Sequence, residues 1–279
     1  MAQPTQVLDW IPDNTSNIND PVSLKAYGYT LDAWPLSSNH NWIFNVVSQW
    51  LDYYKAIDDK VLRSDLTLIV GTTFQVLTAQ TVIDGIDEIA NGVTLTIEIT
   101  AAAVSGSLNF YNFKNPLGTI KIQSDTAVTD YLTSSNTIYD FQNVECAVTI
   151  DQTWIVCTGN VAALSLVNCT GIVSVSSFNV DINTGDGLSI IGCSNVFLSS
   201  PDINSSGSSN YAICVADNSL VMCDNLGVSG TIFYDWCIIR NSTVTDNNPG
   251  TTIASSTIDD GGAYRYYTGG VWTQIYNSF

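Results

Sequence analysis

Charged residues are scarce in this chain of 279 residues, and basic residues are the scarcest. Charged side chains make up 12% of the sequence, with 8 Lys or Arg against 26 Asp or Glu, so the net charge is -18. Between Lys121 and Arg240 there is no basic residue, whereas 11 acidic ones occur. Because phosphate binding depends on Lys and Arg that displace counterions, this acidic field excludes nucleic acid and anionic membranes as partners.

Histidine is nearly absent as well. The one histidine, His40, has no nucleophile context around it, so the sequence does not favour a Ser-His-Asp or Cys-His hydrolase. The count of one excludes a metal site built on histidine. The sequence also has no P-loop, no convincing dinucleotide fingerprint and no calcium-binding nonapeptide pattern. We therefore assign no catalytic, cofactor-binding or metal-ligating residue, and we expect no cofactor.

Long apolar runs are missing too. No run of 18 apolar residues occurs, and the first five residues contain no basic segment followed by an apolar one, so we expect neither an export signal nor membrane insertion. In a reducing cytoplasm the seven cysteines stay as thiols. Cys169 and Cys193 occupy equivalent repeat positions, which favours stacked buried thiols over the alternative, disulfide bonds.

What the sequence does contain is a repeat with an offset of 24 residues. Four stretches match, beginning at Leu164, Leu188, Ala212 and Trp236. The equivalent positions are Leu166, Ile190, Cys214 and Ile238, then Val167, Ile191, Val215 and Ile239, then Ile172, Val196, Leu220 and Val244, with a small polar set at Thr170, Ser194, Asn218 and Ser242. A unit this short buries its apolar face only by stacking on its neighbours, so the repeat predicts a solenoid.

The strand pattern specifies the type of solenoid. Residues 93–99 alternate apolar and polar side chains without a break, and an irregular coil at 141–150 matches the first repeat at an offset of 25. Asn and Gly recur at the expected corners, namely Asn168, Gly171, Gly192, Asn195, Asn218 and Asn241. The consensus of a leucine-rich repeat is absent. We predict an all-β chain with a right-handed parallel β-helix over residues 66–250, of about seven coils with about three short strands each.

The two segments that precede the predicted β-helix differ from it in composition and in hydrophobic pattern. Residues 1–35 are rich in Pro and Asn and are predicted to be extended, and residues 36–65 are predicted to contain a helix. The helix carries an apolar stripe formed by Trp42, Ile43, Val46, Trp50, Tyr53 and Ile57. An apolar stripe of this size needs another apolar surface to pack against. The favoured surface is the same stripe on other copies of the chain, in a symmetric helix bundle of a homotrimer. Packing against the chain's own solenoid is the alternative.

The last segment, residues 251–279, has two aromatic-rich runs around the sequence Thr268, Gly269 and Gly270. This pattern predicts a β-hairpin. We expect the hairpin to cap the open end of the solenoid, whose edge would otherwise be free to aggregate. An exposed ligand platform is the alternative.

A short stretch also resembles a known family. Residues 25–57 contain Lys25-Ala26-Tyr27-Gly28-Tyr29, then Trp34-Pro35, then Asn41-Trp42-Ile43-Phe44-Asn45, and then Trp50 and Tyr53-Tyr54. This stretch resembles the N-terminal segment of bacteriophage and prophage tail fibres and tailspikes. The resemblance implies a homotrimeric virion protein of the tail, assembled in the host cytoplasm, with residues 1–35 attaching it to other tail or baseplate proteins.

The functional prediction is a structural and receptor-binding component of a phage tail that attaches to a glycan or protein of the host surface. Two alternatives remain, a tailspike that cleaves polysaccharide and an adaptor that makes no host contact. Glycoside cleavage needs two carboxylates in one groove, for which the repeats offer six candidates. These are Asp181, Asp186, Asp202, Asp217, Asp224 and Asp235. Turn formation beside Gly and Asn is the favoured role for them, so we expect no enzymatic activity.

Overall fold

A computed structural model describes residues 60–71, 76–101, 103–124, 130–247, 256–259, 261–268 and 271–276. Residues 62–279 form a compact unit of their own. The predicted extended segment 1–35 and the helix stripe lie outside the described residues, so both stay predictions. At the described end of the segment 36–65 the backbone is extended, with strand β1 at Val61–Leu62.

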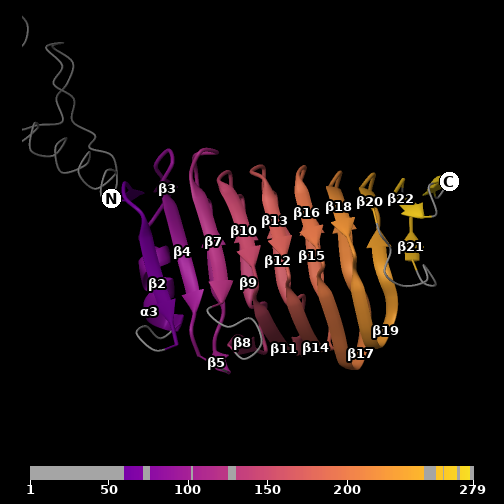
Figure 1. Ribbon diagram of the computed structural model, residues 1–279, viewed down its shortest axis with the longest axis horizontal. Helices are drawn as coiled ribbons and strands as arrows, with labels where there is room; N and C mark the ends of the chain where they lie inside the picture. The colour runs from indigo at the N-terminus through magenta and orange to yellow at the C-terminus, as the bar shows by residue number, and fades with distance from the viewer. Residues whose placement is uncertain are drawn as a thin grey trace, which may run out of the picture. The chain divides into compact units, whose positions relative to one another are not determined.

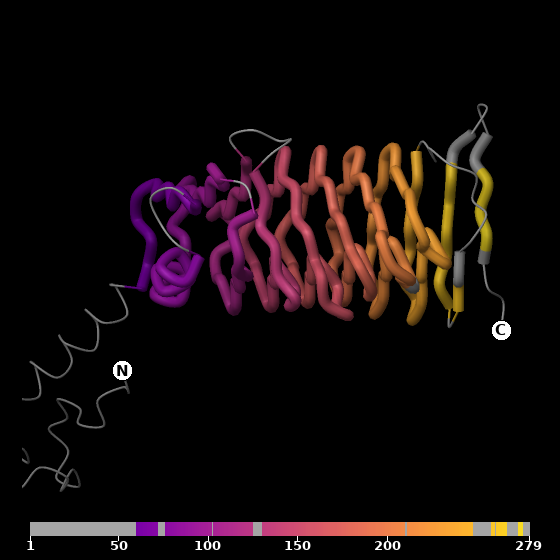
Figure 2. The backbone as a smooth tube through the Cα atoms, turned by 90° about the horizontal axis from the view of Figure 1, so that it is seen from below, coloured from indigo at the N-terminus to yellow at the C-terminus, as the bar shows by residue number. Residues whose placement is uncertain are grey.

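The unit is a parallel β-solenoid of about seven turns, as predicted. Its coils stack side by side in sequence order, as Figure 1 and Figure 2 show for the coloured part of the chain. A typical coil has three strands, such as β9 (Tyr139–Gln142), β10 (Ala147–Asp151) and β11 (Trp154–Asn160). Each strand pairs in parallel with its equivalent in the next coil, so the solenoid has three faces.

The first face contains β10 and nine further described strands. These are β2 (Leu66–Val70), β4 (Thr94–Ile99), β7 (Thr119–Ser124), β13 (Val173–Ser176), β16 (Val196–Ser199), β18 (Leu220–Asp224), β20 (Thr243–Asp246), β22 (Ala263–Thr268) and β23 (Val271–Tyr276). The buried, inward side chains of these strands are mostly apolar, because alternate residues of a strand point to opposite sides, and Ser124 and Asp246 are polar exceptions.

The second and third faces are continuous in the later coils, where two long strands bend from one face into the other. The second face comprises β5 (Val104–Ser105), β8 (Tyr131–Ser134), β11, β14 (Asn179–Thr184) and the first residues of β17 (Asp202–Ala216) and β19 (Gly227–Ile238). The third face comprises β6 (Leu108–Tyr111), β9, β12 (Leu164–Val167), β15 (Leu188–Ile191), the last residues of β17 and β19, and β21 (Ser256–Ile258).

The constant offset of 24 residues is wrong in detail. Leu164 pairs with Leu188, as predicted, but Leu188 pairs with Ile213 and not with Ala212. On the first face Val196 pairs with Val221, so Leu220 lies one position away from the predicted column. Since one residue of shift turns a side chain to the other side of a strand, Leu220 is 43% exposed.

Ile172 and Cys214 are misplaced by one residue in the same way. Ile172, predicted to be in the core, is 58% exposed because Val173 takes the inward place opposite Val196. Cys214 pairs with Cys237, and Ile238 pairs with Val215. The offsets vary around 24 because the corners differ in length and because the register of β17 on β19 shifts between Ser205 and Ser209.

Several predicted corners are confirmed. The backbone takes a positive φ at Asn168 (53°), Gly192 (66°), Asn218 (60°) and Asn241 (58°). Asn and Gly adopt this conformation at low cost, which is why they recur where the chain turns from one face to the next. At one corner the side chains also stack, since the Asn168 amide donates a hydrogen bond to Asn143 Oδ1 at 3.2 Å.

The cysteines are free thiols, and all except the half-buried Cys214 are buried. Cys169 and Cys193 are stacked as predicted, because the backbone N–H of Cys169 donates to Cys193 Sγ at 3.4 Å. Burial raises the pKa of the Cys146 thiol to about 12, so this side chain stays protonated and acts as an apolar core residue.

The N-terminal end of the solenoid contains a helix that the sequence patterns did not predict, α3 (Val76–Ile83). Its Gln80 side chain bonds to both backbone groups of Asn109 in edge strand β6, donating to the carbonyl at 2.9 Å and accepting from the N–H at 2.8 Å. Nearby, the short strand β3 (Glu88–Ile89) precedes β4, and the N–H of Ala90 donates to the Leu62 carbonyl. Through the two hydrogen bonds of Gln80, helix α3 covers the open edge of strand β6.

At the C-terminal end the predicted hairpin is confirmed. Strands β22 and β23 pair antiparallel, and β22 continues the parallel ladder on β20. The ring of Tyr264 is buried, and its hydroxyl donates to Asp246 Oδ2 at 2.9 Å. The hairpin therefore covers the edge of β20, which fits the predicted cap.

Candidate functional site: a polar groove with an aromatic wall

A groove runs across the outward side of the second face, over β11, β14 and the beginnings of β17 and β19. Its volume is about 530 Å³. The lining residues belong to consecutive coils, and they are Trp154, Asn179, Val180, Asp181, Asp202, Asn204 and Ser229. Parallel strands in register place every second side chain of each coil in an outward row, so the groove follows from the ladder itself.

Two such rows form the groove. In the first row Trp154 pairs with Asn179, and Asn179 pairs with Asp202. In the second row Asp181 pairs with Asn204, which pairs with Ser229. Neighbouring coils are about 4.8 Å apart in such a ladder, so polar groups recur at a spacing that suits successive hydroxyls of one ligand.

The Asp181 carboxylate links two other lining residues of the groove, Trp154 and Asn204, through hydrogen bonds. One carboxylate oxygen accepts a hydrogen bond from the Trp154 indole N–H at 2.9 Å, and the other accepts one from the Asn204 amide at 2.9 Å. The Ser229 hydroxyl in turn donates to Asn204 Oδ1 at 3.1 Å. This chain of bonds fixes the orientation of the indole and the amide before any ligand arrives, which reduces the ordering cost of binding.

The aromatic wall extends into the preceding coil. The rings of Tyr131 and Trp154 lie 4.3 Å apart at an interplanar angle of 42°, and both side chains are half-buried. Aromatic rings present an apolar face of negative potential, against which the C–H groups of a sugar ring pack well. Carboxylates and amides beside that face accept and donate hydrogen bonds, as sugar hydroxyls require.

Of the six candidate aspartates, the groove brings together two. Asp181 and Asp202 are diagonal neighbours on adjacent strands of the second face. Asp217 is engaged elsewhere, because its carboxylate forms an ion pair with Arg240 at 2.9 Å. Asp224 lies at the end of β18 on the first face.

The remaining two aspartates are half-buried outside the groove. Burial raises the pKa of the Asp186 carboxyl above its usual range, although the hydrogen bond from the N–H of Tyr211 lowers it by a smaller amount. Burial likewise raises the pKa of Asp235. Neither residue is brought beside a second candidate carboxylate by an observed contact, so the one pair with shared access to a groove is Asp181 and Asp202.

The sequence patterns missed most of the groove. Trp154, Asn179, Asn204 and Ser229 point outward, whereas the repeat was recognised from inward apolar positions. A signal does exist, since Trp154 and Asn179 are 25 residues apart, the offset that also relates the coil at 141–150 to the first repeat. The six residues of the predicted helix stripe lie outside the described part of the chain.

Comparison with models of protein families, with curated proteins and with solved structures gives no match. Within the described residues, no helix is long and apolar enough to span a bilayer, and no group of three His, Cys, Asp or Glu side chains is placed to hold a metal ion.

Proposed function

We propose that this chain is a structural and receptor-binding component of a bacteriophage or prophage tail, and that its second-face groove binds glycan of the host surface. The observation that carries the proposal is the Trp154 indole, held by Asp181 beside a row of amides, a carboxylate and a hydroxyl. This combination of one apolar wall and many hydrogen-bonding groups suits a sugar chain. The resemblance of residues 25–57 to tail-fibre segments supports the location on the virion.

A homotrimer belongs to the same proposal. One groove per chain offers a modest contact area, and three rigid copies on one particle would raise the apparent affinity through effective concentration. The predicted helix stripe, which includes Ile43 and Trp50, is the proposed trimer contact. The proposed partners are thus other copies of the chain, tail or baseplate proteins at the N-terminal segment, and host glycan at the groove.

Binding to purified lipopolysaccharide and capsular polysaccharide preparations, immobilised as an array, tests the groove. We expect the full chain to bind one or more of them, and Trp154→Ala to weaken that binding by about tenfold or more. Phe197→Ala is the matched control, because Phe197 is an aromatic residue 37% exposed on the first face. Binding by Trp154→Ala at the wild-type level would contradict the proposal, and no binding to any preparation would favour an adaptor.

Measuring reducing sugar released from the same polysaccharide preparations separates adhesion from cleavage. The diagonal pair of Asp181 and Asp202 is the specific observation that keeps a polysaccharide depolymerase as the second candidate. Release of reducing sugar by the wild type, lost in Asp202→Asn, would establish the enzyme and refute pure adhesion. Binding without release of sugar is the expected outcome.

Solution mass tests the trimer. We expect a particle of three times 30.2 kDa by light scattering, and a single 30.2 kDa chain for Ile43→Asp with an unchanged β-type circular dichroism spectrum. A charge in the apolar stripe would have to be desolvated in the bundle, which opposes association. A wild-type mass of one chain would overturn the homotrimer.

A further inference from the structure

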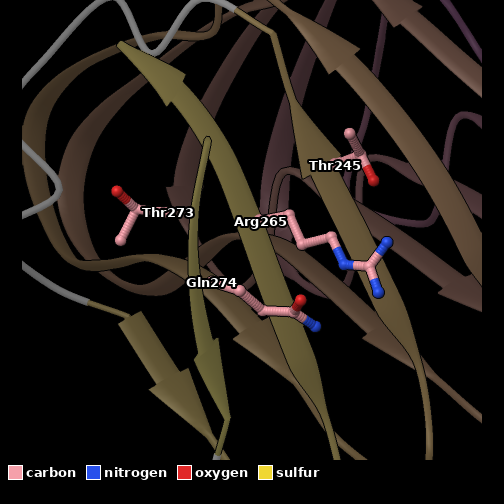
Figure 3. Close-up of a pocket in the computed structure, with 4 residues that line it drawn as sticks. All are labelled: Thr245, Arg265, Thr273 and Gln274. Carbon is pink, nitrogen blue, oxygen red and sulfur yellow. The ribbon is translucent and has the colours of Figure 1, made fainter. Parts of the chain in front are cut away.

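A second pocket lies at the C-terminal end of the described solenoid, on the outward side of the first face. Strands β20, β22 and β23 bring Thr245, Arg265 and Gln274 into one row, because Thr245 pairs with Arg265 and Arg265 pairs with Gln274. Figure 3 shows the guanidinium group and the Gln274 amide on the same side of the hairpin. With Thr273 these residues line a cavity of about 430 Å³.

The row presents hydrogen-bond donors that lack an acceptor, namely the guanidinium of Arg265 and the side-chain nitrogen of Gln274. Within the described part of the chain, Arg265 forms no ion pair and no hydrogen bond, although its side chain is exposed and has five N–H groups. The side-chain nitrogen of Gln274 is buried and has no hydrogen-bond partner among the described residues. A buried donor without an acceptor costs free energy, so such a group marks a place where a bound molecule completes the bonding.

The charges around the row leave this guanidinium available. Arg240, by contrast, has a carboxylate partner in Asp217, with which it forms an ion pair. The neighbours of Arg265 along its row are uncharged, namely Thr245 and Gln274, with Met222 one strand further. Of the acidic side chains on β18 and β20, Asp246 is buried and bonded to the Tyr264 hydroxyl, and Asp224 lies at the end of β18.

We propose that this row is a binding site for a single carboxylate or phosphate group. The planar fork of Arg265 fits two oxygens of such a group, the Thr245 hydroxyl offers a further donor, and the Gln274 amide supplies the donor that now lacks an acceptor. The site is distinct from the groove at Trp154, which contains two carboxylates and lies on another face. It does not depend on the proposed function, since it can be tested with small anions.

Titration of the full chain with sodium glucuronate, glycerol phosphate and glucose, at low ionic strength, tests the site by calorimetry or by NMR of the arginine Nε–H groups. We expect glucuronate or glycerol phosphate to bind at a 1:1 ratio and glucose not to perturb Arg265. The preferred anion shows whether the ligand class is a sugar acid or a phosphorylated polymer. Arg265→Gln should weaken the binding by about tenfold or more, because it removes the charge and the fork.

Two further variants make the test specific. Gln274→Glu keeps the side-chain shape and adds a carboxylate directly opposite Arg265, so it should occupy the guanidinium and abolish anion binding. Arg240→Gln is the control, since it removes one positive charge that already has a partner, and it should retain wild-type affinity. Trp154→Ala should also retain it.

Three outcomes would overturn the site. Equal binding of glucose and glucuronate would show that no charge is recognised. An equal loss in Arg240→Gln and Arg265→Gln would mean that the anions respond to net charge only. Wild-type affinity in a folded Gln274→Glu variant would show that the row does not act as one site. Thermal melting of each variant confirms that the comparison is made between folded proteins.

Discussion

At the scale of single residues, one column inside the solenoid shows how a corner is stabilised. The column contains Cys169, Cys193, Ser219 and Ser242, one from each of four successive coils. The side chain of each later coil accepts a hydrogen bond from the backbone N–H of the coil before it, at 3.4 Å, 3.0 Å and 3.2 Å in that order. A buried N–H at a corner has no strand opposite it, so a side chain has to supply the acceptor.

From this column we expect that, at Cys193, the ability to accept a hydrogen bond contributes more to stability than the size of the side chain. Cys193→Ala removes the acceptor of the Cys169 N–H and should lower the free energy of unfolding by about 1–3 kcal/mol. Cys193→Ser keeps an acceptor, and serine already occupies this place in the next two coils, so it should remain closer to the wild type. Urea unfolding followed by circular dichroism measures both. Equal losses in the two variants would contradict the role given to the side-chain acceptor.

At the scale of strands and coils, the sequence predicts the architecture better than the register. Apolar residues recur because each coil must fill the same interior, and this predicts a parallel solenoid of about seven coils. The sequence does not reveal which corner is one residue longer. An apolar side chain such as Leu220 therefore matches the predicted column in the sequence although its neighbour Val221 faces the core.

The sequence patterns missed helix α3 and the groove for two different physical reasons. Helix α3 has eight residues, and its buried side chains, Val76, Ala79 and Ile83, are too few to show a helical period within a β-rich region. Trp154 and its polar neighbours point to solvent, where packing does not restrict residue type. Of the candidate site, the aspartates Asp181 and Asp202 could be identified in advance, because they stand out in the repeats, but their partners could not.

At the scale of the whole molecule, acidic charge opposes the fold at neutral pH. The net charge is -18, and no basic residue occurs between Lys121 and Arg240 to offset the 11 carboxylates there. Stacked coils bring such side chains closer together than they are in the unfolded chain, so their repulsion destabilises the folded state. Burial adds to this effect at Asp186 and Asp235, because the charged form of a half-buried carboxylate loses hydration.

The direction of the pH dependence follows from these two aspartates. A carboxyl whose pKa is raised on folding binds a proton more readily in the folded state than in the unfolded state. Stability should therefore increase as the pH falls through the raised pKa, and this gain is complete below the ordinary value of 3.8. It is lost as the pH rises through the raised value. We expect the melting temperature to rise as the pH is lowered from about 7.5 towards 4.5, above the pI of about 4.1.

Asp186→Asn isolates one group in this dependence. The amide oxygen of Asn still accepts the N–H of Tyr211, but there is no charge to desolvate, so the variant should melt at a higher temperature than the wild type at pH 7 and vary less with pH. Asp217→Asn is the control: it removes an exposed ion pair with Arg240, so no such gain is expected. If Asp186→Asn followed the wild-type curve, the penalty would have to come from the carboxylates as a whole. Added salt, which screens exposed charges more than half-buried ones, would then also raise the melting temperature at pH 7.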